Sequence, residues 1–458
     1  MASCGVPELT SAAGSRADLP LTGADCFLRA FDHEIRRMNG ASHVSQLVLR
    51  LGPGFDAQGF RRMLEQAARA HPLLRAPVAR RLGLGPPVFR LAAAVRCPLP
   101  RVEIHEAKAP PGGEPPLPEL FCSRLNQPLS LRRGELLRFD AVRYAGGAAG
   151  TDLAASWLHL LFDGAGSERF LRWLDECFRG ERRLAELPDP LETAPLPGPR
   201  ASFGERGRAA RAWQGWHDGM GARPPRSLAG PLRRTPQALR YSVDSFSEQE
   251  TARVVAAASR RAGFLTPMLF YLAAALRAHH AVFRARGVDP GSYVVPLPVN
   301  LRPKGAEGAV FRTHVSLIWF QTFPEQMEDF DGLVADLKAQ RVAAIRAGQI
   351  ENGRHAMDFA RLAPRRLYAH MARRSLRGEL CSFFFAFTDA FLPGLQSFFG
   401  AEIRNGFHVP PVPPSPGSCV ALSLRDRHLN VTHVHQRGVL SERELAIFRE
   451  RLRADLLG

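Results

Sequence analysis

The sequence lacks any paired pattern of cysteines. Its 458 residues include seven cysteines, an odd number, and no two of them form a C-x-x-C pair. The seven are Cys4, Cys26, Cys97, Cys122, Cys177, Cys381 and Cys419. A disulfide framework uses an even set of cysteines, and a zinc knuckle uses closely spaced pairs. The pattern therefore argues against both arrangements and indicates reduced thiols.

Long hydrophobic runs are also missing. No unbroken stretch reaches the roughly 18 apolar residues that a membrane-spanning helix needs. The apolar segment 382–399, for example, contains Asp389 and Pro393. The first residues of the chain do not show the basic and then apolar order of a signal peptide. We therefore expect a soluble, cytoplasmic protein.

Several common catalytic signatures are absent as well. The sequence contains no Walker phosphate loop, no G-x-S-x-G nucleophile elbow and no G-x-G-x-x-G dinucleotide fingerprint. It also shows no internal repeat. These absences leave the nucleotide-hydrolysing, serine-hydrolase and dinucleotide-dependent classes without support.

Acidic residues are in the minority. The 61 Lys and Arg residues outnumber the 44 Asp and Glu residues, so the formal net charge is +17. Such an excess suits nucleic acid, an anionic membrane surface, or a phosphate-bearing or acidic partner such as a nucleotide thioester or a carrier protein. The alternative is a compositional habit, because the arginines are scattered along the chain. Nucleic-acid binding would rest on charge alone, since no motif combines aromatic and basic residues, and we do not predict it.

Length and composition predict two globular domains. A chain of 458 residues with 45% hydrophobic and 23% charged residues is too long for one ordinary core and too apolar to be disordered. Residues 185–238 are rich in Pro, Arg and Gly, which predicts a linker that contains a short helix. The predicted domains then cover residues 1–184 and 239–458.

Strand and helix patterns alternate within each predicted domain, which indicates an α/β fold class. Apolar patterning predicts strands over 45–54, 86–92, 136–147, 151–162, 292–302 and 314–323, and helices over 55–74, 167–180 and much of 326–376. In the C-terminal domain, Ser247 with Glu250 and Ser441 with Glu444 form capping boxes that mark two further helix starts.

One short motif sits where a strand gives way to a helix. The apolar segment 151–162 contains His159 near its end, and Asp163 and Gly164 complete the pattern H-x-x-x-D-G. Ser167 is the expected N-cap of the following helix, which places the motif in a strand-to-helix turn. Taken alone, such a histidine is more often an ordinary turn residue than a catalytic one.

Flanking segments give this motif a context. In chain order, the sequence contains "HPLLRA" (71–76), "LNQPLSLRRGELLRFDAVRY" (125–144), "HLLFDGAG" (159–166), "LTPMLFYLAAALRAH" (265–279), "VPLPVNLRP" (295–303) and "PPSPGSCVALSLRDRHLNVTHVH" (413–435). With these segments in this order, the chain resembles the chloramphenicol-acetyltransferase-like superfamily of acyltransferases. That superfamily includes the condensation domains of nonribosomal peptide synthetases, the wax ester synthase and diacylglycerol acyltransferase group, and the plant BAHD enzymes.

The resemblance implies a particular architecture and reaction. It implies two chloramphenicol-acetyltransferase-like α/β sandwich domains in a V, with a tunnel between them that the acyl thioester enters from one face and the acceptor from the other. His159 would act as general base without a covalent acyl-enzyme, and Asp163 would form a structural ion pair with Arg302. Gly164 would provide a tight backbone conformation, and Thr388 would contribute to the oxyanion site.

The implied partners are an acyl-CoA or acyl carrier protein as thioester donor and a small-molecule or lipid acceptor with an alcohol or amine group. No cofactor besides this thioester substrate is expected. His433 and His435 share one face of a predicted strand, but no third ligand lies nearby, so no metal site is predicted. Peripheral membrane contact and the oligomeric state stay open. The alternative function is a non-catalytic, condensation-domain-like protein that binds an acyl carrier protein or a lipid.

The sequence departs from its relatives in three places. Leu158 precedes His159, whereas condensation domains have two consecutive histidines. Arg312 and Thr313 stand where many bacterial relatives carry a Gly-Asn pair, which is expected to alter the tunnel wall. No "DFGWG" segment is present, which argues against a true BAHD enzyme.

Overall fold

The computed structural model describes residues 18–81, 84–109, 115–145, 150–186, 201–230, 238–302, 309–361 and 363–458. Parts of the predicted linker, residues 187–200 and 231–237, lie outside the described residues, as does Cys4. No described helix has the length and hydrophobicity that crossing a lipid bilayer requires.

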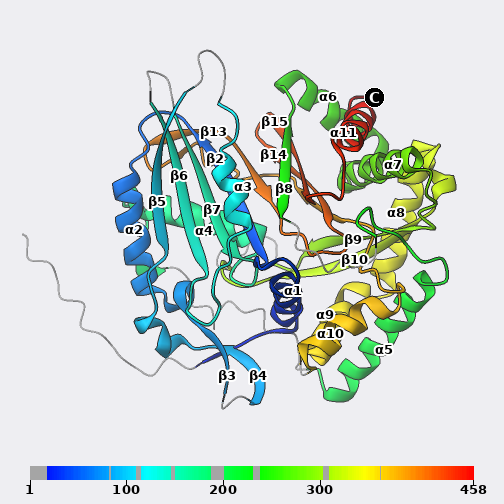
Figure 1. Ribbon diagram of the computed structural model, residues 1–458, viewed down its shortest axis with the longest axis horizontal. Coiled ribbons are helices and arrows are strands. Elements are labelled where there is room, and N and C mark those ends of the chain that lie inside the picture. Colours follow the sequence, from blue (N-terminus) through cyan, green and yellow to red (C-terminus); the bar gives the residue numbers. More distant parts are fainter. Residues whose placement is uncertain are drawn as a thin grey trace, which may run out of the picture.

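The N-terminal half is built on a six-stranded sheet (Figure 1). Its strands, in spatial order, are β12 (Ser397–Phe398), β13 (Ala401–Val409), β2 (Val44–Leu51), β7 (Thr151–Leu158), β6 (Leu137–Ala145) and β5 (Arg101–Lys108). All neighbours pair antiparallel except β5 and β6, which are parallel. The helices of this half are α1 (Gly23–Asn39), α2 (Ala57–Ala70), α3 (Glu119–Leu125) and α4 (Gly164–Phe178). A small sheet comprises β1 (Leu19–Pro20), β4 (Leu84–Phe89) and β3 (Val78–Arg81).

The predicted apolar stripe of α2 faces this sheet. Asp56 caps the helix by accepting a hydrogen bond from the backbone N–H of Gly59 at 2.8 Å, as expected for an N-cap. Phe60 and Leu64 are fully buried, and the ring of Phe60 packs edge-on against Phe139 of β6 at 4.9 Å. Helix α2 also contacts α4, so the two helices cover one face of the sheet together.

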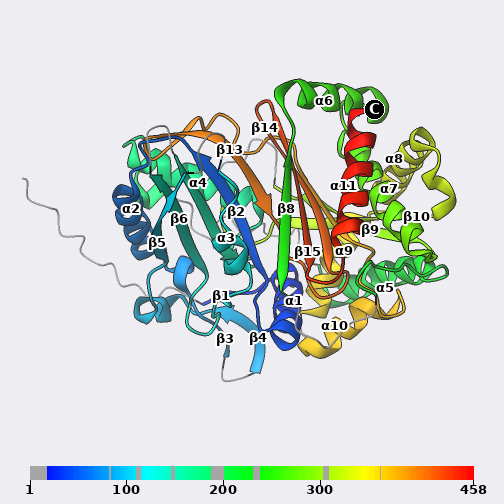
Figure 2. The same ribbon diagram turned by 45° about the horizontal axis from the view of Figure 1, so that its top comes forward.

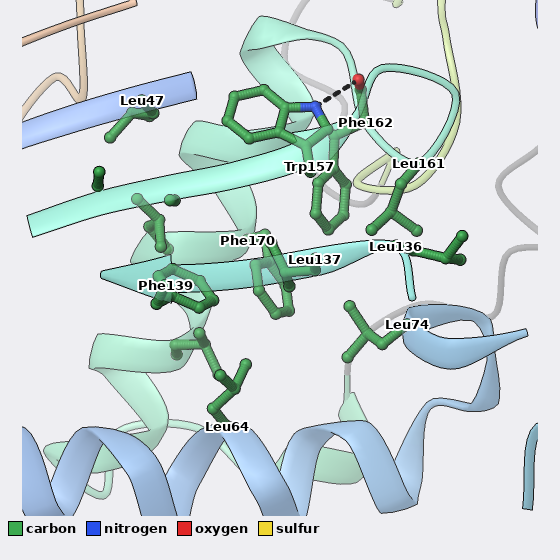
Figure 3. Packing of buried hydrophobic residues seen from close by; sticks show 14 of the residues in the cluster. Leu47, Leu64, Leu74, Leu136, Leu137, Phe139, Trp157, Leu161, Phe162 and Phe170 are labelled. Atoms are coloured by element: carbon green, nitrogen blue, oxygen red, sulfur yellow. Dashed lines mark hydrogen bonds between the residues drawn. The ribbon is translucent and has the colours of Figure 1, made fainter. Parts of the chain in front are cut away.

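Strand β7 is apolar along its whole length because it lies in the middle of the sheet. Every residue from Thr151 to Leu158 is buried, with β2 on one side and β6 on the other. Beyond the strand, the chain turns back on itself, and the indole N–H of Trp157 donates a hydrogen bond to the carbonyl of Phe162 at 3.0 Å (Figure 3). The Phe162 ring stacks on Phe170 of α4 at 5.1 Å. This turn is therefore fixed by the core beneath it.

The C-terminal half has a second sheet and most of the helices. The sheet contains β11 (Phe384–Thr388), β14 (Ser418–Arg425), β15 (His428–Gln436) and β8 (Leu239–Ser245), in that order. A separate antiparallel pair consists of β9 (Tyr293–Asn300) and β10 (Val315–Thr322). The helices are α5 (Phe203–Met220), α6 (Glu248–Ala262), α7 (Met268–Arg286), α8 (Phe330–Arg346), α9 (Gln349–Ala360), α10 (Arg365–Arg374) and α11 (Glu442–Leu457). In Figure 2, α6, α7 and α11 lie together beside the second sheet. Short 3-10 segments are Pro72–Arg75, Leu91–Arg96, Leu184–Glu186 and Pro324–Met327.

Local sequence signals explain several of these helices. The capping boxes of Ser247 with Glu250 and of Ser441 with Glu444 are both present, which confirms the two predicted helix starts. The prediction that Ser167 caps α4 is wrong, because the helix begins at Gly164 and Asp163 is its N-cap. Asp163 occupies the N-cap position because its carboxylate accepts a hydrogen bond from the backbone N–H of Gly166 at 2.8 Å.

One strand crosses from the C-terminal half into the first sheet. Strand β13 pairs antiparallel with β2, with Val409 opposite Gln46 and Ile403 opposite Leu51, and the chain then returns to β14 in the second sheet. Helix α1 makes the opposite crossing and packs against α9 and α10 (Figure 1). The domain boundaries at 184 and 238 stay a prediction, and each half supplies an element to the other.

Candidate active site

His159 lies at the first position after β7. Its backbone N–H donates to the carbonyl of His43 at 3.0 Å, and its Nδ1 is 3.2 Å from the carbonyl oxygen of Phe162. A carbonyl oxygen only accepts, so we assign the hydrogen to Nδ1 and the lone pair to Nε2. Within the described part of the chain, Nε2 has no hydrogen-bond partner and is not sealed from solvent. The ring therefore offers a bare nitrogen to the cavity that it lines.

The surroundings of His159 keep it neutral. Burial lowers its pKa below the usual 6.5, although its own backbone, the carboxylate of Asp163 and the carbonyl of Phe162 oppose this shift. The imidazole of His43 stacks on it, with ring centroids 5.5 Å apart and planes at 16°. Burial also lowers the pKa of His43 well below its ordinary value, so the neighbouring ring is neutral too. A neutral imidazole is the form that accepts a proton.

Asp163 has no capacity left for proton transfer. Its two carboxylate oxygens accept four hydrogen bonds of 2.8 Å each, two from the guanidinium of Arg302 and two from the backbone N–H groups of Gly166 and His314. The side chains of Asp163 and Arg302 are only 4% and 1% exposed. Burial opposes ionisation, but Arg302 and the backbone donors outweigh it and hold the pKa of Asp163 below its ordinary value. The structure thus contains the ion pair expected from the sequence.

The segment after Arg302 holds the turn that carries His159. The backbone N–H of Arg312 donates to the carbonyl of Leu161 at 2.7 Å. The guanidinium of Arg312 pairs with Asp25 of α1 at 2.6 Å, and Arg312 has a left-handed φ of 74°. It does not line the cavity, whereas Thr313 does. Arg312 is therefore a structural anchor between α1 and the turn.

Two glycines follow Asp163, and the structure gives the tight position to Gly166 rather than to Gly164. Gly164 does not adopt a positive φ, so the expectation that it provides an unusual backbone conformation is wrong. A side chain at Gly164 would make an ordinary contact, with a Cβ 3.5 Å from Nε2 of His408. At Gly166, in contrast, a Cβ would lie 2.3 Å from the carbonyl oxygen of Val310. Gly166 is thus the residue whose small size permits the close approach of segment 309–314.

His159, Asp163 and Gly164 line a cavity of about 610 Å³. Both halves of the chain line it, largely with apolar side chains such as Phe27 and Phe31 of α1, Leu297 of β9, Leu317 of β10 and Phe384 of β11. The polar groups in its wall include His159, Glu168, Asn300, Thr388, His408 and Ser423. A mostly apolar pocket with a few polar groups is typical of a small-molecule site. Thr388 lies at the end of β11 in this wall, and its oxyanion role stays a prediction.

Three polar cavity residues were not singled out in the sequence. Glu168 could have been found, because it lies one helical turn beyond Gly164 on the same face of α4. His43 immediately precedes β2, and His408 lies on β13. Neither shows a local signal, since only the pairing of distant strands brings them to the motif.

The fold is that of chloramphenicol-acetyltransferase-like proteins and condensation domains. Solved structures of this class align with almost the whole chain, at sequence identities low enough that the likeness establishes the fold alone. The first condensation domain of the CDA synthetase has 17% identity and a TM-score of 0.70, covering 97% of this chain and 96% of its own. The TRI3 trichothecene 15-O-acetyltransferase from Fusarium sporotrichioides has 12% identity and a TM-score of 0.68, covering 98% and 97%. The starter condensation domain of rhizomide synthetase has 14% identity and a TM-score of 0.62, covering 96% and 94%. No family model matches the chain, and neither does any curated protein.

Breaking the Asp163–Arg302 pair should lower stability. Asp163→Asn and Arg302→Gln should each cost about 3 to 5 kcal/mol in the free energy of unfolding, because each leaves one buried charge without its partner. The double variant should cost less than the sum of the two, with a coupling of about 0.5 to 3 kcal/mol. Urea denaturation of the four proteins measures this cycle. Strictly additive losses would contradict a direct pair.

The two glycines provide a matched comparison. Gly166→Ala should destabilise the protein by about 1 to 3 kcal/mol, because the new methyl group meets a backbone carbonyl that cannot rotate away. Gly164→Ala should leave stability unchanged or raise it by up to about 1 kcal/mol, since alanine favours the helix. Thermal unfolding of both variants decides the point, and equal stabilities would refute the steric role of Gly166.

Proposed function

We propose that this protein is an acyltransferase that moves an acyl group from acyl-CoA or a carrier-bound thioester to an alcohol or amine. The observation that carries the proposal is the neutral His159, whose bare Nε2 faces a large apolar cavity lined by both halves of the chain. The names of the structural neighbours support it. One of them is an O-acetyltransferase, and another is a starter condensation domain in complex with C8-CoA and Leu-SNAC.

In the proposed reaction, Nε2 of His159 takes the proton of the acceptor O–H or N–H group as that group attacks the thioester carbonyl carbon. The resulting tetrahedral intermediate carries its negative charge on the former carbonyl oxygen, to which the hydroxyl of Thr388 would donate a hydrogen bond. When the intermediate collapses, the C–S bond breaks and the departing sulfur takes the proton from the imidazolium. The imidazole of His159 is therefore neutral again at the end of the turnover.

The thiol in the cavity wall is consistent with direct transfer of the acyl group from donor to acceptor, without an acyl-enzyme. Cys419 is the thiol that lines the cavity among the described residues, and burial raises its pKa far above the ordinary value. It is therefore a poor candidate for an acyl-enzyme nucleophile. Holding both substrates beside one imidazole supplies much of the remaining rate enhancement.

Replacement of the proposed base should abolish transfer without unfolding the protein. His159→Ala should lower kcat about 10²- to 10⁴-fold, the usual contribution of a general base. The measurement is release of free thiol from octanoyl-CoA and other acyl-CoAs across a panel of alcohols and amines. His217→Gln is the control, because its Nδ1 likewise contacts a carbonyl, that of Trp213 at 2.9 Å, and it does not line the cavity. If His159→Ala kept the turnover of the wild type, the assignment of His159 as the base would be wrong. If the wild type bound acyl-CoA but released no thiol, the non-catalytic alternative would be favoured.

The pH profile should report the shifted histidine. Because burial lowers the pKa of His159, its neutral form persists below pH 6.5, and kcat/KM should begin to fall only at lower pH. The decline should disappear from the residual activity of His159→Gln. An acid limb centred above pH 6.5 would contradict the neutral base.

A further inference from the structure

A second histidine in the cavity wall has its own carboxylate partner. Nε2 of His408, on β13, is 2.8 Å from Oε1 of Glu168, on α4. The other oxygen of Glu168 accepts the backbone N–H of Leu392 at 2.8 Å. The side chains of His408 and Glu168 are 11% and 9% exposed. Because the carboxylate accepts at Oε1, we assign a hydrogen to Nε2 of His408.

The remaining ring nitrogen of His408 is open. Nδ1 makes no hydrogen bond to any described residue, and it is not among the side-chain atoms that are both buried and unpartnered. The ring of Phe391 packs edge-on against the imidazole, with centroids 5.1 Å apart, and the backbone N–H of His408 donates to Ser423 at 3.2 Å. The imidazole is thus held at one nitrogen and on one side, and its other nitrogen reaches the cavity that His408 lines.

His408 lies beside the proposed base. A Cβ built on Gly164, the first residue of α4, would lie 3.5 Å from Nε2 of His408, and both histidines line the same cavity. The two histidines have opposite tautomers, with the hydrogen on Nδ1 in His159 and on Nε2 in His408. Each therefore presents a bare nitrogen to the same cavity. Attack on a thioester needs one base, so the second nitrogen is available for another hydrogen of the substrate.

We propose that Nδ1 of His408, oriented by Glu168, accepts a hydrogen bond from a second hydroxyl or amino group of the acceptor. The inference rests on the proposed acyl transfer and names its acceptor class: molecules with two polar hydrogens, such as diols or amino alcohols. In an apolar cavity, a hydrogen-bonding group without a partner is costly. An acyl-acceptor substrate that donates a hydrogen bond to His408 is therefore preferred. A site built to bind a hydroxyl strongly rejects an analogue without one. Glu168 is a positioning residue in this arrangement.

The first test compares 1,2-octanediol with 1-octanol, using octanoyl-CoA as donor and thiol release as readout. The wild type should favour the diol at least about 10-fold in kcat/KM. His408→Leu should reduce this ratio to near unity, chiefly through the KM of the diol and with the KM of octanoyl-CoA unchanged. His408→Asn retains a hydrogen-bond acceptor on a short side chain and should recover part of the diol preference. Glu168→Gln should lower the diol preference relative to the wild type.

His435→Leu is the matched control. His435 is 9% exposed, like His408, and lies on the neighbouring sheet but does not line the cavity. The His435→Leu variant should leave the ratio of kcat/KM for 1,2-octanediol to that for 1-octanol unchanged. If His408→Leu lowered kcat/KM equally for 1,2-octanediol and 1-octanol, the role of His408 would be merely structural. That result would overturn the inference and leave acyl transfer established.

A second test does not depend on turnover. In protein labelled with ¹⁵N-histidine, the resonance that His408→Leu removes should show the hydrogen on Nε2, and its Nδ1 signal should shift when 1,2-octanediol is added but not when 1-octanol is added. A hydrogen on Nδ1, or no shift with the diol, would overturn the inference even if no acyl transfer were found. Absence of transfer to every acceptor, with the shift present, would refute the proposed function alone.

Discussion

The architecture of the cavity wall depends on the buried pair of Asp163 and Arg302. Removing two charges from water is costly, and the geometry offsets this cost with two parallel hydrogen bonds and two further backbone donors to the same carboxylate. One oxygen of Asp163 also caps α4, so the pair fixes where that helix begins. Because Arg302 comes from the C-terminal half, the pair also ties the turn after β7 to that half.

This arrangement separates structural from chemical duties within one short turn. Asp163 is saturated with hydrogen bonds and Gly166 permits the close backbone contact, which leaves His159 as the residue with an open nitrogen. Burial keeps the imidazole neutral, and the carbonyl of Phe162 fixes its tautomer. In the proposed reaction, this imidazole would take a proton from a bound alcohol or amine.

The exchange of elements between the halves explains how the polar groups of the cavity come together. Strand β13 leaves the C-terminal half to pair with β2, and it carries His408 to the start of α4, where Glu168 meets it. Helix α1 crosses the other way and adds Phe27 and Phe31 to the cavity wall. The cavity is therefore lined by both halves, and His408 and Glu168 meet in its wall although they are 240 positions apart in sequence.

The sequence by itself determined the strong local features: the apolar strand before His159, the stripe of α2, the capping boxes at Ser247 and Ser441, and the motif whose context implied Arg302 as a partner. The first three follow from periodicity and side-chain chemistry within a few residues, whereas Arg302 as a partner was implied by the resemblance to the superfamily. Only the tertiary structure decided that Asp163 rather than Ser167 caps α4, that Gly166 is the crowded glycine, and that His408 meets Glu168. The Asp163 cap spans only three residues, but the sequence offers Ser167 as a competing cap. The other two contacts join Gly166 to Val310 and His408 to Glu168, residues that are far apart in sequence and meet only when the two halves fold together.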